Sequence, residues 1–113
     1  MLKYNDIEKQ YKRSFILFRE FLFKKWNVQE AHIVRAQFDE MSDDEVEGLF
    51  TKFFDSHRIF GYESYSPNGH DGEYWGWKIY SNRYYFDNIC YKDRYSAINI
   101  RIEESFKLLE HKV

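Results

Sequence analysis

Residues 74–91 constrain the fold of this chain more than any other stretch, because eight of these eighteen positions are aromatic. Apolar and polar residues alternate on both sides of Ser81 and Asn82, which is typical of two β-strands joined by a tight turn. Strand side chains alternate between two faces. One face of the first arm therefore carries Trp75, Trp77 and Ile79. The other carries Tyr74, Gly76, Lys78 and Tyr80. We expect a hairpin with arms at about 73–80 and 84–91.

The rest of the chain predicts helices that pack on this hairpin. Ser42 and Glu45 form a capping box ahead of apolar residues at helical spacing, which predicts a helix ending near Ser56. Asp93 predicts the start of a last helix at about 94–111. Asp6 predicts a first helix at about 7–26. Residues 31–38 fit either a strand or a helix, with a slight preference for helix.

A strand at 58–65 and a Pro- and Gly-containing loop at 66–72 precede the hairpin. Strands that follow one another through short turns pair as antiparallel neighbours. A chain of 113 residues is the size of one domain. We therefore expect residues 1–113 to form a single α+β domain. Its three-stranded antiparallel meander has helices on one face, in the order α-(α)-α-β-β-β-α.

Charge is unevenly distributed along the chain. Residues 1–27 carry seven bases and three acids, whereas residues 28–56 carry two bases and eight acids. Most of the acids lie between Asp39 and Glu47, where a solvated helix start is the simplest explanation. The alternative is a surface that meets a basic partner. Its candidate residues are Asp43, Asp44 and Glu47, together with the outward rings Tyr74, Tyr80 and Tyr84.

Nucleic-acid binding is the competing hypothesis. Bases interleave with rings along the hairpin and just after it, as single-strand binding requires. The candidate residues are Lys78, Arg83, Lys92 and Arg94. The domain as a whole is slightly acidic, with a formal net charge of −2, which is unusual for a nucleic-acid-binding protein of this size.

The sequence offers little for catalysis. The four histidines are scattered, and no metal-ligand spacing, phosphate loop or cysteine pair is present, so we expect no enzyme, no metal and no cofactor. The single Cys90 is expected to be a half-buried hydrophobic residue in a strand. The start of the chain lacks the apolar segment of a signal peptide, and no apolar run could span a membrane, which predicts a cytoplasmic protein.

The predicted first helix is apolar on more than one side. Phe15, Ile16, Leu17 and Phe23 widen its apolar surface beyond a single stripe. A helix of this kind lies between two layers or meets a partner. The 7–26 helix is therefore either a central core helix or the contact of a homodimer.

The C-terminal half resembles small uncharacterised α+β proteins carried by phages and mobile elements. The matching stretches are residues 80–87, the segment from Arg94 to Ala97, and Leu108-Leu109-Glu110. The resemblance covers about forty residues and carries no catalytic residues. It implies a phage or mobile-element setting more than an activity. Small proteins without catalytic motifs in that setting often act by occluding a host protein, so we expect a non-enzymatic accessory protein that binds and inhibits a host protein, for example a defence nuclease such as a CRISPR effector.

Overall fold

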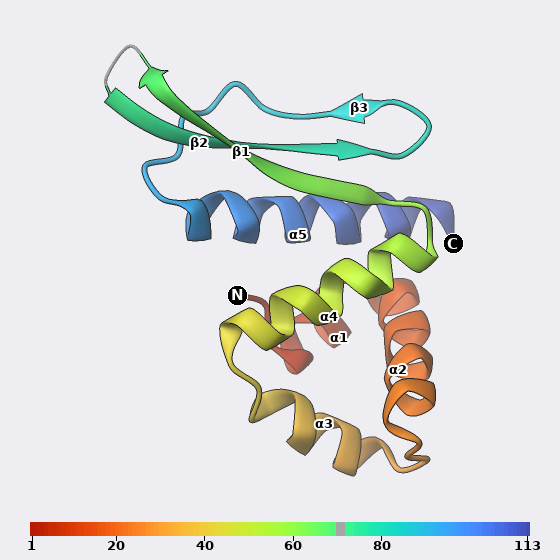
Figure 1. Cartoon of the computed structure of the whole chain (residues 1–113). Helices are drawn as coiled ribbons and strands as arrows, with labels where there is room; N and C mark the ends of the chain where they lie inside the picture. The colour runs from red at the N-terminus through yellow and green to blue at the C-terminus, as the bar shows by residue number, and fades with distance from the viewer. Residues whose placement is uncertain (70–71) are drawn as a thin grey trace.

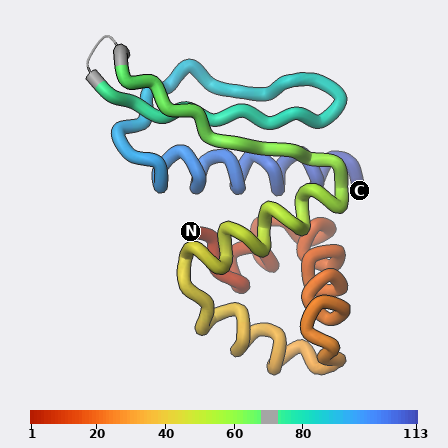
Figure 2. The backbone as a smooth tube through the Cα atoms, viewed as in Figure 1, coloured from red at the N-terminus to blue at the C-terminus, as the bar shows by residue number. Residues whose placement is uncertain are grey.

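The last helix lies between the sheet and the other helices (Figure 1). The computed structural model describes residues 1–69 and 72–113. The elements are α1 (Tyr4–Gln10), α2 (Lys12–Trp26), α3 (Ala31–Asp39), α4 (Asp43–Ser56), β1 (Phe60–Gly69), β2 (Gly72–Tyr80), β3 (Tyr84–Tyr85) and α5 (Arg94–Lys112). The strands form one antiparallel sheet in the order β1-β2-β3. All five helices lie on the same side of it (Figures 1 and 2). The predicted α+β meander is confirmed.

The core between α5 and the other helices is built of aromatic rings. Phe106 of α5 packs edge-on against Phe54 and Phe50 of α4, with ring centroids 4.8 and 5.4 Å apart. It also contacts Phe18 of α2 at 6.1 Å and stacks on Tyr11 at 5.3 Å. Edge-on and offset ring pairs of this kind stabilise a core beyond their buried area.

The predicted helix at 7–26 is wrong at Tyr11, where φ −131° and ψ 64° break it into α1 and α2. The Tyr11 ring is buried against Phe106, and Glu110 supplies the cap that the new helix start lacks. Its carboxylate accepts hydrogen bonds from the Arg13 and Ser14 backbone N–H groups and from Ser14 Oγ, at 2.9, 2.8 and 2.7 Å. A tertiary contact from the end of the chain thus starts α2.

The cap predicted for the first helix is also wrong. Lys3 is the N-cap residue of α1, and Asp6 lies within the first turn, where its carboxylate accepts the Lys3 backbone N–H at 3.0 Å. Most of the second apolar side of α2 packs inside this chain: Phe15 is buried against Tyr4, while Ile16 remains 50% exposed. Of the helices described, none is both long enough and apolar enough to cross a bilayer.

The other predicted helices are confirmed. Residues 31–38 are helical, within α3. Ser42 caps α4 by accepting the Glu45 backbone N–H, and Glu45 accepts the Ser42 N–H in return. Asp93 caps α5 through the Ser96 N–H at 2.8 Å.

The first two strands are longer than expected. β1 starts at Phe60, two residues later than predicted, and continues to Gly69, and β2 begins at Gly72. The predicted loop at 66–72 is therefore wrong where it includes residues 66–69 and residue 72. Antiparallel pairing with β2 extends through Ser66 and Tyr74, and the register shifts between Ser66 and Gly69. Residues 70 and 71 of that loop lie outside the described part of the chain.

The second hairpin arm is shorter than expected, since β3 contains only Tyr84 and Tyr85. Asp87 accounts for the interruption, because its carboxylate accepts hydrogen bonds from Trp77 Nε1, the Tyr91 hydroxyl and the Ile89 backbone N–H. Burial and the bond to Asp87 raise the pKa of Tyr91, so its hydroxyl stays protonated and donates. A bridge between Trp75 and Tyr91 then restores the pairing.

Cys90 lies in this interrupted segment, outside any strand, and is exposed. The expectation of a half-buried strand residue is wrong because the Asp87 contacts turn the chain away from β2 before it reaches Cys90.

The glycines of β1 and α4 make a matched pair of stability tests. A Cβ on Gly61 would lie 2.7 Å from Cδ of Arg101, whose guanidinium is held by Glu63. We expect Gly61→Ala to lower the free energy of unfolding by about 1–3 kcal/mol. A Cβ on Gly48 would meet nothing within 4 Å, so Gly48→Ala should raise it by about 0.5–1 kcal/mol. Urea denaturation measures both, and a neutral Gly61→Ala would contradict the close packing of α5 on β1.

The Glu110 contact predicts a pH-dependent stability. Partial burial acts to raise the pKa of Glu110, but the hydrogen bonds from Ser14 and Arg13 outweigh it and hold the pKa below 4.5. The stabilisation is therefore present above about pH 4.5 and is lost as the pH falls through the folded-state pKa. We expect Glu110→Gln to cost about 1–2 kcal/mol at pH 7 and progressively less towards pH 3.

Denaturation of wild type and variant at several pH values measures this difference. Glu8→Gln, at an exposed position of α1, is the control and should cost little at any pH. A cost of Glu110→Gln that stays constant from pH 7 to pH 3 would contradict the role of the carboxylate.

Candidate binding surface

The face of the sheet that points away from α5 carries four exposed rings. Strand pairing sets Phe60 opposite Tyr80 in β2, and Tyr84 of β3 lies opposite Tyr80 on its other side. Tyr62 lies two residues along β1 and points the same way. The exposed fractions are 45% for Phe60, 49% for Tyr62, 44% for Tyr80 and 62% for Tyr84. We call these four residues the outer ring cluster, and this side of the sheet the outer face.

The outer ring cluster includes two of the three rings predicted from the sequence. Tyr80 and Tyr84 lie with their ring centroids 5.1 Å apart. Tyr74 points to the same face but is half-buried, and six residues along a strand place it about 20 Å from Tyr80. Phe60 and Tyr62 were missed as candidates, although the alternation in 58–65 puts them on one side of their strand, because the sequence does not give the strand register.

The opposite face of the sheet is buried where α5 covers it. Trp77 is 5% exposed and Ile79 is fully buried against α5. Glu63 pairs with Trp77 across the strands and so points inward as well, where Arg101 Nε donates to it at 2.6 Å. The inward position of Glu63 leaves the outer face without its charge.

The charge of the outer face is therefore positive and small. Where β1 and β2 pair, the residues that point outward are Phe60, Tyr62, Ser64, Ser66, Tyr74, Gly76, Lys78 and Tyr80. Lys78 is the one charged residue among these paired positions. A partner for this face must tolerate an ammonium group and meets no carboxylate from these strands.

The four bases predicted for nucleic-acid binding do not gather around Lys78. Arg83 stacks over the Tyr85 ring, 4.7 Å from its centroid, and Tyr85 lies opposite the inward-pointing Ile79. Lys92 is exposed, just beyond the bridge at Tyr91. Lys78 and Arg83 thus point to opposite faces of the sheet.

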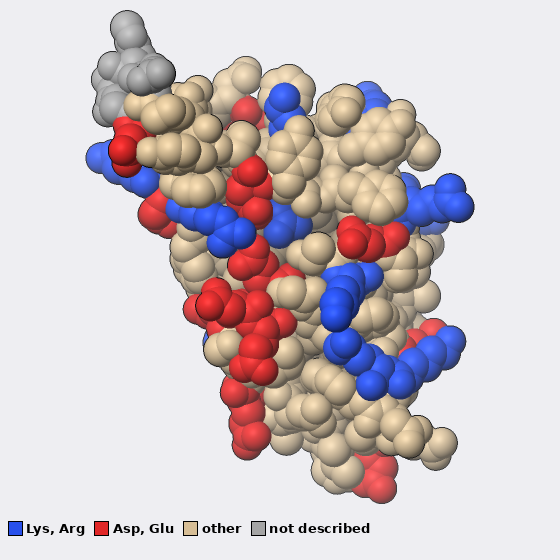
Figure 3. Space-filling model, viewed as in Figure 1, with Lys and Arg blue, Asp and Glu red and all other residues tan. Residues whose placement is uncertain are grey.

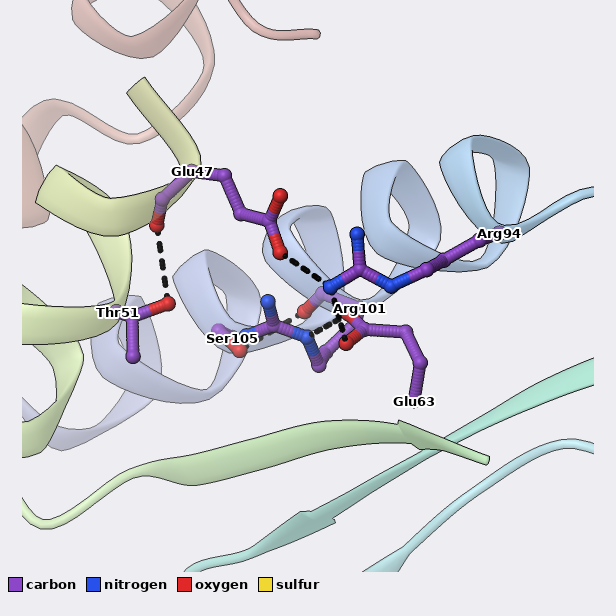
Figure 4. Close-up of polar contacts among 6 residues, drawn as sticks. All are labelled: Glu47, Thr51, Glu63, Arg94, Arg101 and Ser105. Atoms are coloured by element: carbon purple, nitrogen blue, oxygen red, sulfur yellow. Dashed lines mark hydrogen bonds and ion pairs between the residues drawn. The ribbon is translucent and has the colours of Figure 1, made fainter. Parts of the chain in front are cut away.

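Arg94, the fourth of these bases, is engaged on the helical side of the sheet in an ion-pair network with Glu47 (Figure 4). Arg94 Nη2 lies 3.0 Å from Glu47 Oε1 and 3.8 Å from Glu63 Oε2. Glu63 in turn holds Arg101, and both of these side chains are less than a tenth exposed. Glu47 lies on α4, Glu63 on β1 and both arginines on α5, so the network ties these three elements together. Each buried charge of the network needs its partner, because a buried charge left unpaired is strongly destabilising.

The acidic surface predicted on α4 is therefore reduced to its first turn. Asp43 and Asp44 are exposed there, whereas the Glu47 side chain is 18% exposed and bound to Arg94. In Figure 3 the acidic side chains run down from the sheet past the first half of α4, while Lys and Arg gather towards α2. The start of α4 and the outer face lie on opposite sides of α5, so they do not form one surface (Figure 1).

Comparison with family models, with curated proteins and with solved structures found no match to this chain.

Proposed function

We propose that this chain is a non-enzymatic binding protein that inhibits another protein by covering part of its surface with the outer ring cluster. The observation that carries the proposal is the exposure of Phe60, Tyr62, Tyr80 and Tyr84 on one face. Contiguous exposed apolar surface marks interaction sites, and protein interfaces are enriched in aromatic residues. Rings that are already held by strand pairing also lose little conformational freedom on binding.

The resemblance to phage and mobile-element proteins supports a host protein as the target, including a defence nuclease of the CRISPR type. Inhibition by occlusion requires no catalytic group in the inhibitor. Asp43 and Asp44 supply a second candidate contact for such a target, because exposed carboxylates complement the basic groove of a nucleic-acid enzyme. A target that contacts both would have to reach around α5.

Single-stranded nucleic acid is the second candidate partner, favoured by the same rings. Stacking of a base on an aromatic side chain contributes about 1–3 kcal/mol. Phosphate contacts need cations, however, and Lys78 is the one charged residue at the paired positions of the outer face. Nucleic-acid binding here would consequently show a shallow dependence on salt.

The outer ring cluster predicts how binding responds to truncation. We expect the double variant Tyr80→Ala, Tyr84→Ala to lose the partner recovered by wild type from host lysate. Loss of a central aromatic anchor costs about 2 kcal/mol or more, which corresponds to about thirtyfold in affinity. The measurement is a pull-down split into nuclease-treated and untreated halves, followed by titration of the recovered partner.

Ile16→Ser is the matched control, because Ile16 is a similarly exposed apolar residue on α2, away from the sheet. It should leave the recovery unchanged. Equal loss in both variants would contradict a role specific to the outer ring cluster. Recovery that depends on intact nucleic acid would contradict the protein-partner proposal and support the second candidate.

A further inference from the structure

The centre of the outer face is hollow. Ser64 and Gly76 lie opposite each other in β1 and β2 and form a pair of small residues at the centre of this face. Tyr74 and Lys78 flank Gly76 along β2, and the segment 86–90 forms the remaining wall. The hollow encloses about 220 Å³.

The interrupted third strand creates this hollow. Because the chain leaves β2 after Tyr85 and returns to it at Tyr91, the segment between them arches away from the sheet (Figure 1). Phe86 and Ile89 lie on the arch and are 57% and 58% exposed. The hollow is thus bordered by two apolar side chains that the fold leaves uncovered.

One base and one acid line the hollow, Lys78 and Asp87, so their formal charges cancel. The Asp87 carboxylate is engaged within this chain, because one oxygen accepts from Trp77 Nε1 and the Tyr91 hydroxyl and the other from the Ile89 N–H. The Lys78 ammonium is exposed. The Ser64 hydroxyl lies 3.4 Å from the position that a Gly76 Cβ would take, so it faces the floor of the hollow. The hollow therefore offers one cation and one hydroxyl to a ligand.

We propose that this hollow receives an acidic side chain of the partner protein, with an apolar neighbour of that side chain resting on Phe86 and Ile89. This inference rests on the proposed function and names the chemistry of the partner segment. By the measure in which one water needs about 10–15 Å³, the hollow of about 220 Å³ has room for an Asp or Glu side chain. A carboxylate complements the Lys78 ammonium and accepts from the Ser64 hydroxyl.

An acidic peptide suits the hollow better than a nucleic-acid strand does. A strand would bring a phosphate at every nucleotide past a single ammonium group, whereas an acidic peptide brings one carboxylate to it. Anchor residues that enter pockets within an apolar surround are typical of protein interfaces.

Two variants of β2 test the hollow directly. Gly76→Val fills the floor with a residue that favours strands, and Lys78→Glu reverses the charge of the wall. Gly76→Ala, whose Cβ would make an ordinary contact with Ser64, and Lys52→Glu on α4 are the matched controls. Circular dichroism and urea denaturation confirm that each variant is folded before its binding is measured.

The first probe is a blocked hexapeptide of alternating Glu and Leu, titrated against the full chain by amide NMR, with its Gln analogue and oligothymidylate as comparisons. We expect the Glu peptide to shift the amide signals of Ser64, Gly76 and Lys78. Binding should weaken at least tenfold with the Gln analogue and with either test variant, but not with the controls. Equal shifts from the Glu and Gln peptides, shifts away from the hollow, or shifts from oligothymidylate alone would overturn the inference.

The second probe is the protein partner recovered through the outer ring cluster. If Gly76→Val and Lys78→Glu each weaken its binding tenfold or more, the inference holds for that partner. If the Tyr80, Tyr84 double variant loses the partner while both hollow variants retain it, the inference fails and the proposed function stands. If all of these variants retain it, both fail.

Discussion

The ring of Phe106 is the contact on which the arrangement of the layers depends. It lies among rings from α2 and α4 and stacks on Tyr11, so that one side chain joins α5 to two other helices and to the junction between α1 and α2. Because the helices all lie on one side of the sheet, α5 must be apolar on the side that meets them and also on the side that meets the strands. The sheet and the other helices therefore pack on two sides of one central helix, α5.

A helix covered on two sides can place a charge in the interior only if the charge is matched. Arg101 is 3% exposed between α5 and the sheet, and Glu63 reaches it from the inward side of β1. The same carboxylate lies near Arg94, which also holds Glu47 of α4. Charges that look free in the sequence are thus used to fix α4 and β1 on α5, and the free charge of the surface is smaller than the composition suggests.

Local signals explain which parts of the fold could be predicted. The capping residues Ser42 and Asp93 and the helical spacing behind them define α4 and α5, since both signals act within a few residues. The break at Tyr11 depends on Phe106 and Glu110, which lie almost a hundred residues away, so no local pattern could indicate it. The early end of β3 has a similar origin in the contacts of Asp87 with Trp77 and Tyr91.

The candidate surface was predicted in part for the same reason. Alternation identified Tyr80 and Tyr84 as outward rings, because period two is a property of each strand alone. The contribution of Phe60 and Tyr62 depends on the register between β1 and β2, and the loss of Glu47 and Arg94 from the free surface depends on how α4 meets α5. Both features depend on how the elements pack against one another, which the residue pattern within a single element does not show.

The centre of the outer face favours the proposed binding surface over a sheet whose outer rings serve stability alone. Cross-strand ring pairs such as Phe60 with Tyr80 stabilise a thin sheet by about 0.2–1 kcal/mol each, so the outer ring cluster alone fits either purpose. The pair of Gly76 and Ser64 does not fit a purely stabilising purpose, because glycine weakens a strand interior and Ser64 adds little packing across from it. A sheet built only for stability would place larger residues at this pair. The small pair beside Lys78, under the arch of 86–90, instead leaves room for a group from another molecule.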